Sequence, residues 1–123
     1  MAGLVVGVWA VLPPFSGPEL NTELRVEVAD HAVPGALVLL VSLAAVALVP
    51  RLARPASALL VAGLVVFLAG FWMVATHVPL VAQALGDEAP VGATVYHALP
   101  GVAVAVLGAV WAGSYWGAAS PGE

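Results

Sequence analysis

The chain has 123 residues, of which 63% are hydrophobic and 8% charged, and its mean hydropathy is +1.09. A soluble domain of this length with so few polar residues lacks the polar surface to cover itself, so we expect its apolar side chains to face lipid. Three arginines, no lysine and no cysteine exclude a basic nucleic-acid-binding face, a disulfide scaffold, a thiol enzyme and a cysteine-ligated metal site.

The first apolar segment, residues 2–15, is short for a membrane span and ends at Pro13 and Pro14. A secretory signal peptide is the alternative, but the segment has neither a basic beginning nor a clear cleavage site. We therefore predict a short membrane helix here.

Three longer segments predict membrane-spanning helices. Residues 33–50 and 55–76 carry no ionisable group, and at a rise of 1.5 Å per residue they match a hydrocarbon core of roughly 30 Å. The last segment has Tyr115 and Trp116 near its end, where aromatic side chains prefer the membrane interface. We predict an all-α polytopic membrane protein, a single transmembrane domain over residues 1–123, with helices over about 2–15, 33–50, 55–77 and 98–119.

Charge placement predicts the orientation of these helices. Arg51 and Arg54 lie in the short loop between two spans, which the positive-inside rule assigns to the cytoplasm. Both termini are then cytoplasmic, and the loops at 16–32 and 86–94 are external. The external loops hold six of the seven acidic residues, and this asymmetry supports an even number of spans, namely four.

A five-residue motif, H-A-x-P-G, occurs at residues 31–35 and again at 97–101. The same offset of 66 positions pairs Pro13 with Pro79 without a gap. We interpret the chain as two parallel helical-hairpin repeats whose pseudo-two-fold axis lies along the membrane normal. The repeats cover about residues 1–50 and 55–119.

The segments GVWAVLPPF at 7–15 and HAVPGALV at 31–38 resemble the SPW-repeat family of small bacterial and archaeal integral membrane proteins. In that family a short helix with a Trp ends near a Pro, and a second helix begins at a Gly. The resemblance covers about half of the chain, and Leu12-Pro13-Pro14 stands where the family has Ser-Pro-Trp. It implies the hairpin architecture and a prokaryotic cell membrane, and it supplies no catalytic residue.

The three histidines, His31, His77 and His97, all fall on the predicted external side. Imidazole binds divalent metals and haem iron, and ionisable groups within a membrane protein are candidates for function. If the helices bring the rings together, they form a metal or haem site. In the alternative, each ring lies separately at the interface and bonds water, a backbone carbonyl or a carboxylate.

The acidic segment 16–28 is compatible with an amphipathic surface helix. One stripe of that helix would carry like charges four residues apart, which is a hint of cation binding. The alternation of Leu24, Val26 and Val28 favours a short extended segment instead, and a solvated loop that sets the topology is a third interpretation. The candidate cation-binding residues are Glu19, Glu23, Glu27 and Asp30.

Small residues predict close packing of helices, within one chain or between chains. The pattern includes a G-x-x-x-G motif, and we also expect Trp72 to pack inside the bundle rather than to line a quinone or pigment pocket. The predicted packing glycines are Gly35, Gly101, Gly108, Gly113 and Gly117.

These features favour a non-enzymatic protein of the lipid bilayer, a structural or accessory subunit that self-associates or joins a larger membrane complex. A membrane protein that binds a metal or haem through the histidines is one alternative. A channel or transporter for ions or small solutes is another. An enzyme is least favoured, because the hydroxyls of Ser42, Ser57 and Thr76 have no evident catalytic partner in the sequence.

Overall fold

The computed structural model describes residues 1–15 and 24–119, which contain helices and no strand, so the all-α prediction is confirmed for these residues. Short 3-10 or π-helical turns flank several of the α-helices. The α-helices are α1 (Ala2–Val11), α2 (Leu24–Glu27), α3 (Val33–Leu48), α4 (Pro55–Leu85) and α5 (Val91–Ala119). The turns are Pro13–Phe15, Val28–Ala32 and Val49–Arg51.

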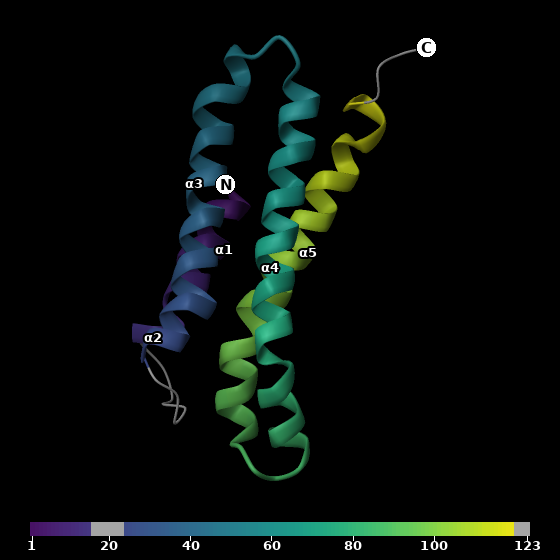
Figure 1. Ribbon diagram of the computed structural model, residues 1–123. Helices are drawn as coiled ribbons and strands as arrows, with labels where there is room; N and C mark the ends of the chain where they lie inside the picture. The colour runs from purple at the N-terminus through teal and green to yellow at the C-terminus, as the bar shows by residue number, and fades with distance from the viewer. Residues whose placement is uncertain (16–23, 120–123) are drawn as a thin grey trace.

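Three helical segments are long and apolar enough to cross a membrane: Arg25–Arg51, Pro55–Leu85 and Val91–Ala119. They are compatible with a membrane protein, as predicted. The segment Ala2–Phe15 is apolar but shorter. In Figure 1, α1 lies along only the lower part of α3, whereas α4 and α5 pack against each other along much of their length.

The helices alternate in direction, so that successive ends meet at two poles of the bundle (Figure 1). The turn between α3 and α4, which contains Arg51 and Arg54, lies at the same pole as the end of α5. The turn between α4 and α5 lies at the opposite pole, on the side of α2. Consecutive long helices are therefore antiparallel.

Helices α4 and α5 extend beyond the bounds expected from the sequence. Helix α4 continues through Pro79 to Leu85, and α5 begins at Val91, so the connecting turn is short. A proline inside an apolar helix removes one backbone hydrogen bond without ending the helix when neighbouring helices support it. As a result, His77 and His97 lie about two helical turns inside the bundle rather than at the ends of the helices.

The acidic segment is described only from Leu24 onward. Its described part is helical and continues through the π-helical turn into α3, so the extended alternative based on Leu24, Val26 and Val28 is wrong. The rest of the predicted surface helix, with Glu19 and Glu23, lies outside the described residues.

Glycines bring α4 and α5 into backbone contact. A Cβ atom on Gly63 would lie 2.5 Å from the backbone nitrogen of Ala112, and one on Gly101 would lie 2.8 Å from the Cβ of Met73. Such contact favours association of helices in lipid, where burying apolar surface gains little. Successive contacts run in opposite directions along the two helices: Gly63 faces Ala112, Phe67 faces Gly108, Gly70 faces Ala105, and Met73 faces Gly101.

Three of the five predicted packing glycines lie at contacts within the chain. Gly35 faces the backbone of α1 at Ala10 and Val11, while Gly101 and Gly108 face α4. No atom lies within 4 Å of a Cβ built on Gly113 or Gly117, so these two take no part in packing among the described residues. Four other glycines also lie at contacts between helices and were not predicted from the sequence, namely Gly3, Gly7, Gly63 and Gly70.

The buried core consists of small and medium side chains from α1, α3, α4 and α5. Trp111 packs against it, but Trp72 is 57% exposed, so the expectation that Trp72 packs inside the bundle is wrong. The core consists of Ala10, Val38, Val66, Ala69, Met73 and Val104.

We predict that Gly108→Ala destabilises the fold by about 1–3 kcal/mol, because the new methyl group would collide with the backbone of Phe67, which cannot rotate away. Gly113→Ala is the matched control on the same helix, and it should change stability by less than about 1 kcal/mol. Loss of helical circular dichroism in detergent–denaturant titrations measures both. Equal effects of the two substitutions would contradict the described contact between α4 and α5.

Candidate metal centre

The three histidines meet inside the bundle. His31 comes from the π-helical turn before α3, His77 from α4 and His97 from α5, and their exposed fractions are 1%, 7% and 2%. One ring nitrogen from each residue lies within 4.8 Å of the other two. The alternative in which each histidine lies separately at the membrane interface therefore does not hold.

The contact between α4 and α5 explains why His77 and His97 are neighbours. Gly101 faces Met73, and moving one helical turn further, forward on α4 and backward on α5, leads to His77 and His97. The antiparallel contact that brings the two backbones together therefore also sets the two rings side by side.

Local distortion of the helix accompanies His31. The residues Val28–Ala32 form a π-helical turn, and Pro34 follows within the first turn of α3. A π-helical turn accommodates one extra residue and so changes which side chains face the helix neighbours. His31 is buried within this turn, and turns of this kind are frequent at functional sites.

Hydrogen bonds fix the tautomer of His77. Its Nδ1 atom lies 2.6 Å from the carbonyl oxygen of Met73, which only accepts, so Nδ1 carries the proton and donates it. Thr76 donates its hydroxyl to the same carbonyl at 3.0 Å. The Nε2 atom of a neutral His77 then keeps a free lone pair, and it lies 3.0 Å from Nε2 of His31. Without an ion, His31 donates its Nε2 proton to that lone pair.

The arrangement fits a small ion. An ion bound to imidazole nitrogens at about 2.0–2.1 Å holds two such nitrogens roughly 3.3–3.6 Å apart. The spacings in the cluster, 3.0 Å for one pair and up to 4.8 Å across the set, bracket this value. For His31 to bind through Nε2, its proton must move to Nδ1. That Nδ1 atom is buried and has no hydrogen-bond partner in the described residues, so transfer of the proton to Nδ1 breaks no hydrogen bond at that atom.

The spacing of the rings favours a single ion over haem. The centroid of the His31 ring lies 4.7 Å from that of His77 and 5.4 Å from that of His97, in edge-to-face contact. These contacts leave no slot for a macrocycle between the rings. The cavity that reaches His77 has a volume of about 250 Å³ and runs along the outside of α4 and α5 between Val74, Val78, Val81, Ala98 and Val102.

Two of the described acidic residues lie shortly before His31 in the chain. Asp30 directly precedes His31 and is half-buried. Glu27 is half-buried one helical turn earlier. Among the described residues, the group of side chains that are close enough to hold an ion contains the three histidines and no carboxylate. Of the four residues of the predicted acidic cation surface, Glu27 and Asp30 are described, and Glu19 and Glu23 lie outside the described residues.

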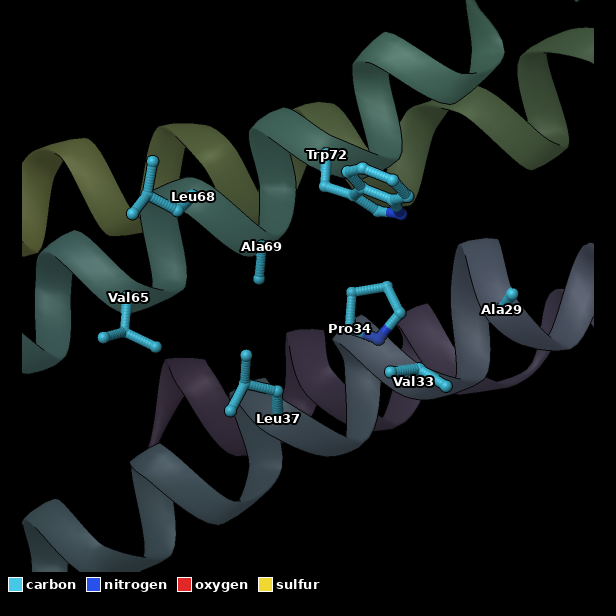
Figure 2. Close-up of a pocket in the computed structure, with 8 residues that line it drawn as sticks. All are labelled: Ala29, Val33, Pro34, Leu37, Val65, Leu68, Ala69 and Trp72. Atoms are coloured by element: carbon cyan, nitrogen blue, oxygen red, sulfur yellow. The ribbon is translucent and has the colours of Figure 1, made fainter.

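Two further cavities lie away from the histidines. An apolar groove of about 470 Å³ separates α3 from α4, and Figure 2 shows Trp72 and Pro34 facing each other across it. A cavity of about 320 Å³ lies toward the other pole and is lined in part by Trp111, Tyr115 and the buried hydroxyl of Ser42. Of the described residues that line these two cavities, none is acidic and none is a histidine.

Comparison with protein-family models, curated proteins and solved structures finds no match to this chain. The resemblance to the SPW-repeat family therefore stays a prediction. Interpretation of the site rests on its own geometry.

Proposed function

We propose that this chain is a small integral membrane protein that binds one transition-metal ion through His31, His77 and His97. The observation that carries the proposal is the convergence of all three histidines of the chain, from three different helical segments, into one buried cluster. Burying imidazole in an apolar bundle is costly unless its nitrogens have partners. An ion supplies a partner for three of them at once.

The chemistry of the donors supports this proposal. Three neutral imidazoles suit zinc and copper ions, and the sequence offers no thiolate. The bond from Nδ1 of His77 to the Met73 carbonyl is the kind of outer-shell contact that orients a ligating imidazole and raises its basicity. We assign no catalytic residue, because the hydroxyls of Thr76, Thr94 and Ser114 bond backbone carbonyls of their own helices.

We further propose four spans, built as two parallel hairpins, in a prokaryotic cell membrane with both termini cytoplasmic. Four pairs of identical residues that are equivalent under the 66-residue offset are buried in both copies, which supports the repeat. Arg51 and Arg54 lie at the pole opposite Asp87 and Glu88, which agrees with the positive-inside rule. The metal site then lies in the outer half of the bilayer. The four identical pairs are His31 and His97, Pro34 and Pro100, Gly35 and Gly101, and Val38 and Val104.

The metal site is tested by elemental analysis of protein purified in detergent from cells supplied with zinc and copper. We expect about one ion per wild-type chain. His97→Leu should lower the affinity at least about a hundredfold, since losing an outer-shell contact alone costs 10–100-fold. Ser42→Ala is the control, because it also alters a buried polar residue, but in the other half of the bundle, and it should retain the ion.

Circular dichroism and gel filtration show whether each variant is folded. A metal-free wild-type protein, or a folded His97→Leu variant with as much metal as the wild type, would overturn the proposal.

Self-association is a second candidate function, for the chain as a structural or accessory subunit. The observation that favours it is the open space beside Gly113 and Gly117, whose G-x-x-x-G spacing suits close contact with another helix. A second copy of α5 or a helix of another subunit would fill that space.

One introduced cysteine tests both self-association and orientation, because the chain has no native cysteine. Gly117→Cys should cross-link to a second copy through a short bis-maleimide, and an impermeant maleimide should label it from the cytoplasmic side. Glu88→Cys, at the opposite pole, should be labelled from outside and should not cross-link. Labelling of Gly117→Cys from outside would refute the orientation, and cross-linking equal to that of Glu88→Cys would refute contact through α5.

A further inference from the structure

The charge of the site, rather than its shape alone, distinguishes among possible ions. Three imidazoles bind as neutral ligands, so they leave the full charge of the ion uncompensated. The side chains described next to the rings are uncharged. The Thr76 hydroxyl lies 3.3 Å from Nδ1 of His77, the Tyr96 ring lies 5.5 Å from the His97 ring, and the groove beside His77 is lined by valines and an alanine. An uncompensated charge in such surroundings is strongly unfavourable.

One carboxylate is positioned to supply the missing negative charge. Asp30 is adjacent to His31 in the π-helical turn and is half-buried. The other described charged residues at this pole are less suited to balance the charge of an ion at the histidines. Arg25, Asp87 and Glu88 are exposed, and Glu27 lies one helical turn before Asp30. A single carboxylate neutralises a monovalent ion and leaves a divalent ion with one excess charge.

The number of ligand atoms also favours a monovalent over a divalent ion. Zinc held by three protein ligands takes a water molecule as a fourth ligand, and that water needs hydrogen-bond partners of its own. Among the described residues, the group of side chains that could hold an ion provides three nitrogens. The side chains that line the adjoining groove are apolar, apart from His77 itself. A three-coordinate ion avoids the need for such a water.

We propose that the site binds monovalent copper, Cu⁺, in three-coordinate form, with Asp30 as the carboxylate that balances its charge. This inference rests on the proposed metal-binding function and specifies its ion. Asp30 acts through charge and does not ligate the ion.

The test is an anaerobic titration of metal-free protein in detergent, with Cu⁺ competed against a chromophoric Cu⁺ chelator and Zn²⁺ against a zinc indicator. We expect one Cu⁺ per chain, with Zn²⁺ bound at least about a hundredfold more weakly. Silver, Ag⁺, a monovalent ion without redox activity under these conditions, should compete with Cu⁺ for the site.

Substitution of Asp30 tests the charge directly. Asp30→Asn should weaken Cu⁺ binding by roughly tenfold or more, and Asp30→Glu, which keeps the charge, should restore most of the affinity. Asp87→Asn is the matched control, since it removes an exposed carboxylate at the same pole and asparagine tolerates the positive φ of 60° at that position. It should leave the affinity unchanged.

The outcomes separate the two proposals. Zinc bound as tightly as Cu⁺ would overturn the assignment of the ion and leave the histidine site standing. An Asp30→Asn variant that is folded and binds Cu⁺ like the wild type would overturn the role of Asp30. A wild-type protein that binds neither ion would overturn the histidine site itself.

Discussion

The close approach of α4 and α5 is the constraint on which the rest of the structure depends. Glycine at Gly70 and Gly108 lets each helix lie against the backbone of the other, and this fixes their relative height as well as their distance. Because Met73 is then opposite Gly101, the next turn places His77 beside His97. A wider separation of the helices would leave these two rings as isolated polar groups in an apolar bundle.

Because the histidines are buried, their ring nitrogens need partners within the bundle. In a bilayer a polar ring without partners is unfavourable, and the pair His31 and His77 satisfies only part of its hydrogen-bonding capacity internally. The Met73 carbonyl holds the His77 ring in one tautomer, with the lone pair of Nε2 directed at His31. Under the proposed function, an ion would meet a His77 ring that is already oriented, so little reordering of that ring would oppose binding.

The sequence predicted the candidate ligands but could not predict their depth. The repeated H-A-x-P-G motif drew attention to His31 and His97. The sequence predicted that one helix ends near residue 77 and the next begins near residue 98, whereas α4 continues through Pro79 to Leu85 and α5 begins at Val91 and continues through Pro100. Tertiary packing keeps those helices intact, and local sequence does not encode it. The π-helical turn around His31 has no comparable sequence signal.

The proposed function requires that the three histidines bind one ion together. X-ray absorption spectroscopy of the metal-loaded protein checks this, because it counts and identifies the atoms bound to the ion. We expect three nitrogen ligands at about 2.0 Å with outer-shell scattering from three imidazole rings. A bound sulfur, or scattering from fewer than three imidazole rings, would contradict it.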